Sequence, residues 1–178
     1  LTQAPHLLVA GATQQGKSVC LNVIITSLLY GKHPSELKFV FIDPKMVEFS
    51  AYSTLIKHYL AVLPDADDEQ SERERAIVKS AKDAEKVLRS LCKEMDDRYE
   101  LMSRAGINKV TLYNEKFKDR KLNPEHGHRF FPYLVVVVDE YADLTLVTGG
   151  SPEEKAASRS ITNCIIRLAQ KGRAAGIH

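Results

Sequence analysis

A glycine-rich stretch near the start of the sequence constrains the fold more than any other feature. Residues 11–18 read GATQQGKS and match the pattern G-x-x-x-x-G-K-[ST] at every fixed position. An apolar run over residues 6–10 precedes this stretch, and a helical pattern over residues 18–30 follows it. A strand, a tight loop and a helix in that order predict a phosphate-binding loop at the edge of a parallel sheet.

The rest of the chain alternates apolar runs with helical patterns, as in an α/β domain with a mainly parallel sheet. Residues 134–138 read LVVVV, and such a β-branched run suits a central strand buried on both faces. Further strands are expected at 37–42 and, as a shorter run, at 59–63, and helices at 76–104, 110–117 and 152–174. We therefore expect one domain over residues 1–178, with a polar charged loop around 65–75.

The longest expected helix carries a single apolar stripe. Its large apolar residues recur at spacings of three and four, which place them on one helical face. They are Leu88, Leu91, Met95, Tyr99 and Met102. This stripe predicts core packing rather than ligand contact. Cys20, on the apolar helix after the glycine-rich stretch, is likewise expected to be a small core residue.

Composition describes a folded domain without identifying its function. A hydrophobic share of 44% and a charged share of 27% exclude wholesale disorder. No apolar run approaches the roughly 18 residues of a membrane-spanning helix. Lys and Arg number 25 and Asp and Glu 23, so the net charge of +2 indicates no strong basic field for nucleic acid. The 3 cysteines are odd in number and far apart, which argues against a disulfide framework or a zinc cluster.

Phosphate binding accounts for each fixed position of the glycine-rich loop. Its glycines let backbone N–H groups turn inward around an anion, and the N-terminus of the next helix adds partial positive charge. Lys17 can reach the β- and γ-phosphates of a nucleotide, and the Ser18 hydroxyl can ligate Mg²⁺. The expected nucleotide-binding residues are Gly11, Ala12, Thr13, Gln14, Gln15, Gly16, Lys17 and Ser18. The alternative is a glycine-containing turn that happens to include Lys-Ser.

An acidic pair follows the most strand-like run of the chain. A buried strand delivers Asp139 to the carboxyl edge of the sheet, where ligands bind in open α/β folds. There Asp139 can support Mg²⁺, and Glu140 can polarise a water for attack on the γ-phosphate. The alternative is that the pair only caps the next turn. No Asn-Lys-x-Asp motif of guanine-selective GTPases occurs, so ATP is the expected nucleotide.

Six stretches of the chain match the signatures of one protein family in the family's order. They read HLLVAG at 6–11, FIDPK at 41–45, EMDDRY at 94–99, YNEK at 113–116, DEYADL at 139–144 and RLAQKGRAAGIH at 167–178. On these residues, nearly the whole chain resembles the motor domain of the FtsK/SpoIIIE family of DNA translocases. Six ordered signatures are far more specific than a phosphate-binding loop alone.

The resemblance implies a RecA-like P-loop NTPase core, a homo-hexameric ring, and ATP-driven movement of double-stranded DNA in chromosome segregation and cell division. It also implies a cytoplasmic domain of an inner-membrane-anchored bacterial protein, with the membrane contacted only through segments absent from this chain. Gln14 stands where relatives usually carry a third glycine, and this difference is expected to reshape the loop or to lower ATP turnover. Relatives continue beyond His178 with a γ-phosphate sensor strand and a winged-helix module, so the domain is expected to be truncated at its C-terminus.

Two arginines in the last expected helix are candidates for completing the site of a neighbouring subunit, as ring ATPases require. Arg167 and Arg173 are six positions apart, or about 240° net around the helix, so both are not expected to serve one site. The resemblance favours Arg173. The alternative is that each arginine lies on a solvated face or pairs with a carboxylate. Asp43 and Lys45 are expected near the catalytic sheet edge, unless they only form a turn.

Three functions remain open at this point. The leading one is the motor domain of a double-stranded DNA translocase with ATP and Mg²⁺ as cofactors. FtsK-like ATPases of conjugation or protein secretion have similar nucleotide sites and form the second. The third is a nucleotide-binding scaffold with little turnover, which Gln14 suggests.

Overall fold

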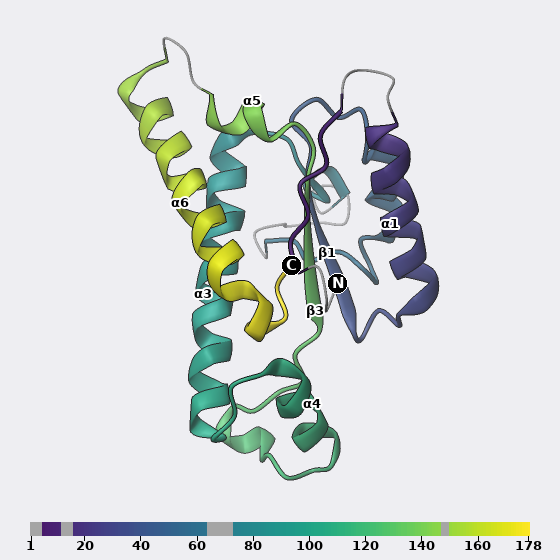
Figure 1. Cartoon of the computed structure of the whole chain (residues 1–178), viewed down its shortest axis with the longest axis vertical. Coiled ribbons are helices and arrows are strands. Elements are labelled where there is room, and N and C mark those ends of the chain that lie inside the picture. The colour runs from purple at the N-terminus through teal and green to yellow at the C-terminus, as the bar shows by residue number, and fades with distance from the viewer. Residues whose placement is uncertain (1–4, 12–15, 64–72, 147–149) are drawn as a thin grey trace.

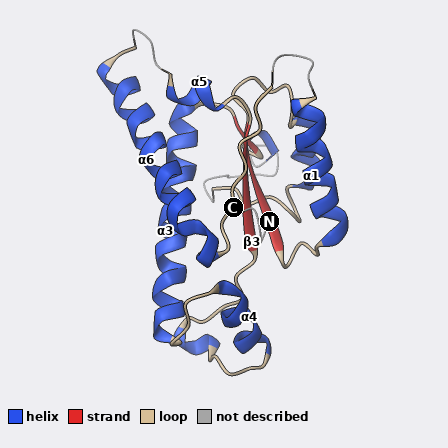
Figure 2. Ribbon diagram, viewed as in Figure 1, coloured by secondary structure: helices blue, strands red, loops and turns tan. Residues whose placement is uncertain are grey.

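The computed structural model describes residues 5–11, 16–63, 73–146 and 150–178, and these form three layers (Figures 1 and 2). A parallel sheet lies in the middle, with its described strands in the order β2-β1-β3. Helix α1 covers one face of the sheet, and α3 and α6 cover the other. The α/β class with a mainly parallel, helix-flanked sheet is therefore confirmed.

The strands are β1 (Leu37–Ile42), β2 (Ile77–Val78) and β3 (Tyr133–Val138). The α-helices are α1 (Lys17–Gly31), α3 (Ala81–Arg104), α4 (Val110–Lys118), α5 (Tyr141–Thr145) and α6 (Pro152–Ala175), and the short 3-10 helices are η1 (Ser50–Leu55) and η2 (Pro124–His126). The strands expected at 37–42 and 134–138 and the helices expected at 18–30, 110–117 and 152–174 are confirmed to within one residue.

Strands β1 and β3 pair over their whole length, from Leu37 beside Tyr133 to Ile42 beside Val138. Successive side chains of a strand point to opposite faces. One set packs with α3 and α6, and the alternate set, which includes Phe39, packs with α1. Strand β1 is thus buried on two faces, whereas β3 is buried on the face toward α1 and only partly buried on the other, where Val136 and Val138 lie.

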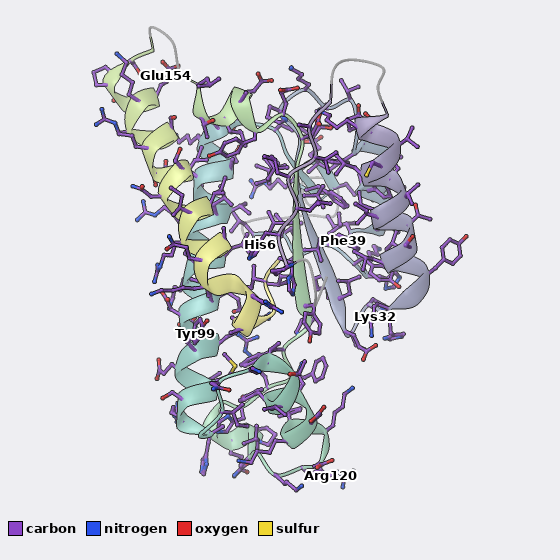
Figure 3. The ribbon with its side chains drawn as sticks, in the orientation of Figure 1. His6, Lys32, Phe39, Tyr99, Arg120 and Glu154 are labelled. Carbon is purple, nitrogen blue, oxygen red and sulfur yellow. The ribbon has the colours of Figure 1, made fainter. Side chains whose placement is uncertain are left out.

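The apolar stripe of α3 packs against α6, as expected for core residues. Leu88, Met95 and Met102 are each no more than 1% exposed. Tyr99 lies at the edge of the stripe, and its hydroxyl donates to the Lys171 carbonyl of α6 at 2.7 Å (Figure 3). Helix α6 begins with a capping box between Ser151 and Glu154. A capping box satisfies backbone N–H groups that the first turn leaves unpaired.

The strand expected at residues 6–10 is not formed. These residues have no regular secondary structure, and Leu8 is 86% exposed. The edge of β3 that faces away from β1 is paired instead with the end of the chain: Leu134 donates to the Gly176 carbonyl, and Val136 donates to the His178 carbonyl. Because that stretch of backbone edge is already occupied, the apolar run has no strand to pair with there.

The helix expected over 76–104 begins only at Ala81. Residues 77–78 form β2, which pairs with the end of β1, and the Ser80 hydroxyl accepts from the Asp83 N–H and caps the helix. The strand expected at 59–63 is reduced to a single parallel bridge between Leu60 and Phe39. Most of the charged loop expected around 65–75 lies outside the described residues.

Helix α1 buries less of its apolar surface than its composition predicts. Ile25 is 1% exposed, but Val19 and Val23 remain exposed at 66% and 59%. Cys20 is exposed as well, so its assignment to the core is wrong. Apolar residues occur on several faces of this helix and only one face meets the sheet. Composition therefore could not show which of them are buried.

Gly172 permits the close turn between α6 and the residues that pair with β3. A Cβ atom built at Gly172 would lie 2.6 Å from the backbone oxygen of Ile177, a contact that only a backbone shift can relieve. We expect Gly172→Ala to lower the free energy of unfolding by about 1–3 kcal/mol in a urea titration. The matched control is Gly31→Ala, because a Cβ there meets nothing within 4 Å. Equal stability of the two variants would contradict this close packing.

Candidate functional site

The site lies where β1 and β3 end, at the carboxyl edge of the sheet. Asp43 and Asp139 directly follow the two strands, and the Asp139 N–H donates to the Ile42 carbonyl at 2.9 Å, which holds the strand ends side by side. Helix α1 begins at the same edge with Lys17, after Gly16 at a φ of 84°. Glycine adopts this left-handed conformation without the steric cost that other residues meet. Residues 12–15 of the expected phosphate loop lie outside the described residues.

Lys17 connects the helix start to the acidic pair. Its Nζ lies 2.7 Å from Asp139 Oδ1 and 3.8 Å from Glu140 Oε2. The hydrogen bond to Asp139 raises the pKa of Lys17, so the side chain stays an ammonium at neutral pH. The structure therefore brings together three residues that the sequence predicts for one site. In this arrangement the Asp139 carboxylate pairs with the Lys17 ammonium, which a bound phosphate would otherwise attract.

Glu140 has an unusual backbone conformation. Its φ of 53° lies in the left-handed region, which few residues other than glycine adopt. Such strain costs on the order of 1–3 kcal/mol, and it clusters at functional sites, where the surrounding structure holds it in place. Glu140 is the residue before α5, and its side chain is 39% exposed. The conformation turns the chain directly after the buried β3, so that Asp139 and Glu140 follow each other at the open edge.

Lys45 also belongs to this cluster. Its Nζ lies 2.9 Å from Asp143 Oδ2 and 3.9 Å from Glu140 Oε2. The hydrogen bond to Asp143 raises the pKa of Lys45. Lys45 thus lies at the sheet edge where the sequence predicts it, and it pairs there with acidic neighbours.

Sequence reasoning missed Glu48. The Ser18 hydroxyl donates to Glu48 Oε1 at 2.5 Å, and the two residues are 30 positions apart. The only hint in the sequence is the Asp-Pro turn at residues 43–44, which suggests that the chain leaves β1 close to the site. No local pattern shows which side chain of the following loop turns back toward α1.

A groove of about 690 Å³ leads from this cluster along β3. Residues 5–11 and 135–138 line it together with apolar side chains of α1 and α6, and Lys17, Asp139 and Glu140 lie at its polar end. Although residues 6–10 form no strand, they therefore still lie close to the catalytic edge, as the motif order predicts.

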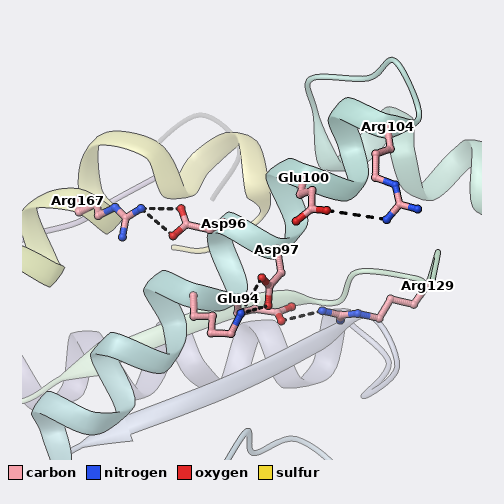
Figure 4. A network of polar contacts seen from close by, with 8 residues as sticks. Glu94, Asp96, Asp97, Glu100, Arg104, Arg129 and Arg167 are labelled. Carbon is pink, nitrogen blue, oxygen red and sulfur yellow. Dashed lines mark hydrogen bonds and ion pairs between the residues drawn. The ribbon is translucent and has the colours of Figure 1, made fainter. Parts of the chain in front are cut away.

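The two candidate arginines have different surroundings. Arg167 Nη2 contacts both carboxylate oxygens of Asp96 on α3, at 2.6 and 2.8 Å (Figure 4). Arg173 lies in the last turn of α6 and is exposed. That turn leads into Ile177, which bridges to Leu134 near the start of β3, whereas Glu140 follows the end of β3. Arg173 is therefore remote from the acidic pair of its own chain.

The oxygen donors at this edge fit a magnesium–nucleotide complex. Mg²⁺ prefers hard oxygen ligands and is usually held by one or two protein groups together with phosphates and water. The Ser18 hydroxyl and the Asp139 carboxylate, which contacts Lys17, are such groups, and Glu48 contacts the Ser18 oxygen. In the ranges that the structure describes, none of the helices combines the length and the hydropathy that a membrane-spanning segment needs.

Comparison with known proteins gives a consistent result. The FtsK/SpoIIIE family profile matches residues 1–178. Proteins named DNA translocase FtsK from Chlorobaculum tepidum and from Lactococcus lactis subsp. cremoris are 45% and 42% identical over all 178 residues. The chain covers only 19% and 20% of those proteins, or about a fifth of their length.

Solved structures agree with the sequence comparison. The pCW3 conjugation coupling protein TcpA, solved as a monomer form with ATPγS, is 27% identical, with a TM-score of 0.75 over 99% of this chain and 42% of TcpA. EssC (ATPases 2 and 3) from Geobacillus thermodenitrificans is 18% identical, with a TM-score of 0.58 over 94% of this chain and 26% of EssC, and shows the fold alone. By its profile match over every residue and its relatives at 42–45% identity, the chain belongs to the FtsK/SpoIIIE family of P-loop ATPases.

Proposed function

We propose that this chain is the ATP-hydrolysing motor domain of a double-stranded DNA translocase that works as a homo-hexameric ring in chromosome segregation and cell division. The observation that carries the proposal is the contact of Lys17 with Asp139 and Glu140 at the end of β3. The relatives named DNA translocase FtsK support the choice of DNA as cargo. The proposed setting is the cytoplasmic side of a bacterial inner membrane, with the anchor outside this chain.

Each site residue has a proposed task in this function. Residues 11–18 surround the phosphates of ATP, and Lys17 moves its charge from Asp139 to the β- and γ-phosphates. Ser18 and Asp139 hold Mg²⁺, which when bound neutralises charge on the phosphates. Glu140 orients and deprotonates the attacking water.

The remaining proposed task falls to an arginine of another subunit. Arg173 is exposed and remote from the acidic pair of its own chain, which suits action on the site of a neighbouring subunit. Arg167 is the weaker candidate because the family resemblance and the position near the end of α6 favour Arg173.

The second candidate function is that of an FtsK-like ATPase of conjugation or protein secretion, which has the same ATPase site but a different cargo. TcpA is a conjugation coupling protein and covers nearly the whole chain with a TM-score of 0.75. The identity to TcpA is 27%, whereas the FtsK relatives reach 42–45%. Higher identity over the same residues favours the chromosomal translocase.

The test is the ATPase rate of the full-length protein with and without duplex DNA. We expect duplex DNA to stimulate hydrolysis severalfold, and the stimulation to weaken with added salt, because contacts to phosphates release counterions. Lys17→Ala is expected to abolish nucleotide binding and the stimulated rate. Stimulation by a secreted protein but not by duplex DNA would refute the proposed cargo. Nucleotide binding without hydrolysis under any of these conditions would favour the scaffold.

A further inference from the structure

The contact between Ser18 and Glu48 has the geometry of a strong hydrogen bond. At 2.5 Å between oxygens, it is as short as hydroxyl–carboxylate bonds in which the acceptor is charged. Since the carboxylate only accepts, the Ser18 hydroxyl must use its proton for this bond, and both of its lone pairs remain available. The bond therefore orients the Ser18 oxygen as a ligand for a cation instead of blocking it.

Glu48 is held in place by a buried carboxylate. Asp43 is 0% exposed, and its Oδ2 accepts the backbone N–H groups of Glu48 at 3.0 Å and of Phe49 at 3.1 Å. Phe49 is 1% exposed, and its ring packs 5.0 Å from that of Phe41 in β1. Met46, inside the same turn, has a φ of 56°. This turn is anchored at both ends in the core, so Glu48 approaches Ser18 from a fixed support.

The charges around Lys17 exceed what one lysine can balance. Asp139 and Glu140 contact it directly, and Glu48 lies close enough to act on its charge. Asp43 adds a buried carboxylate whose Oδ1 has no hydrogen-bond partner in the described part of the chain. Lys45, the next cation, is paired with Asp143 and lies 3.9 Å from Glu140 Oε2, so these four carboxylates and Asp143 face two lysines. A polyphosphate would meet several negative charges here, and a divalent cation would relieve the repulsion.

We propose that Glu48 is a residue of the magnesium–nucleotide site, where it positions the Ser18 hydroxyl and adds the negative charge that makes nucleotide binding depend on Mg²⁺. The inference rests on the proposed ATP site but assigns a new residue to it. Partners that contact a metal ligand from outside fix its orientation, and losing one typically lowers metal affinity about 10–100-fold.

The chain offers a control for a purely structural role of Glu48. One turn along α1, the Tyr52 hydroxyl donates to Asn22 Oδ1 at 2.7 Å, and this bond also connects the segment after β1 to α1. Tyr52→Phe removes that bond without changing the charge at the site. Glu48→Gln keeps its hydrogen bond, because the amide oxygen can still accept from the Ser18 hydroxyl, but it removes the negative charge.

The experiment measures ATPγS binding to the full-length protein by calorimetry, once with Mg²⁺ and once with EDTA. The quantity compared is the ATPγS affinity with Mg²⁺ divided by the affinity in EDTA. We expect Glu48→Gln to reduce this ratio at least about tenfold. Binding in EDTA should be equal or tighter, because the variant removes repulsion between the carboxylate and the phosphates. Manganese binding to the protein–nucleotide complex, followed by its electron paramagnetic resonance signal, should weaken in parallel. Tyr52→Phe should leave both quantities within about twofold of the unmodified protein, because its bond lies outside the charge cluster.

Two results would overturn the proposal. One is an unchanged affinity ratio in Glu48→Gln. The other is an equal reduction of the ratio in Tyr52→Phe, which would show that the effect comes from the packing of α1 against the segment after β1. Should Glu48→Gln unfold, Glu48→Ala replaces it because it removes both the contact with Ser18 and the negative charge, and an unchanged ratio there would overturn the proposal. Lys17→Ala separates this inference from the proposed function. If Lys17→Ala binds ATPγS normally, the nucleotide site itself is misassigned.

Discussion

Glu140→Gln is expected to lower ATP turnover at least about a hundredfold while leaving ATP binding intact. The carboxylate belongs to the second residue after β3, lies 3.8 Å from Lys17 Nζ and is 39% exposed, so it is accessible to a water near the phosphates. An amide of the same shape can still accept a hydrogen bond but cannot take up the proton of the attacking water. The comparison requires the turnover rate of the full-length protein with duplex DNA, together with ATPγS affinity.

The matched control for Glu140 is Asp143→Asn. Asp143 contacts the same Lys45 but lies three residues further along, in α5. We expect this variant to retain turnover within about tenfold, because loss of an exposed ion pair changes energies by about 1 kcal/mol or less. Near-normal turnover in Glu140→Gln would remove Glu140 from the role of base. If the unmodified protein already lacks hydrolysis, the scaffold explains the site better than the motor.

Arg98→Leu is expected to destabilise the protein by about 1–3 kcal/mol, as the loss of the donor to a buried polar group commonly does. Arg98 is 1% exposed, and its Nε donates to Glu94 Oε1 at 2.8 Å. Its Nη1 donates to the Ala175 carbonyl at 2.8 Å, and the guanidinium lies 5.1 Å from the Phe131 ring centre. One side chain thus holds the end of α6 against α3, and leucine would leave a buried carbonyl without its donor.

Urea unfolding at neutral pH measures this loss, and Arg89→Leu is the control. Arg89 lies on the same helix, is 71% exposed, and is 3.7 Å from Glu85. Exposed pairs of this kind contribute about 0–1 kcal/mol, so the control should unfold nearly like the unmodified protein. A similar small loss in both variants would show that the Arg98 contacts do not hold the helices together.

The same experiment has a pH dependence with a definite sign. Burial raises the pKa of Glu94, but a hydrogen bond from Arg129 (Figure 4) and another from Arg98 outweigh it, so the pKa lies below its ordinary value. A carboxyl with a lowered pKa stabilises the fold above its unfolded pKa of about 4.5, and this stabilisation is lost as pH falls through the folded pKa. Arg98→Leu should therefore lose less additional stability on acidification than the unmodified protein.

Local patterns predicted the elements whose residues are constrained along the chain itself. The β-branched run before Asp139 could form only a buried strand, and the stripe from Leu88 to Met102 could pack only as one helical face. The apolar run at residues 6–10 looked equally like a strand, but a strand needs a free backbone edge. Residues 176–178 occupy that edge of β3 at Leu134 and Val136, and no local pattern reveals such competition.

By itself, the sequence determined the α/β fold and the family, because each motif consists of residues close together in the chain, and the motifs occur in a fixed order. It also determined the approach of Lys17 to the acidic pair, because a strand end delivers Asp139 to the sheet edge. Only the tertiary structure decided that Glu48 meets Ser18 and that Arg98 connects α3 to the end of α6. Both contacts depend on where a loop or a helix end lies relative to an element that is distant in the sequence. The packing of the whole core sets that position, and no short stretch of sequence does.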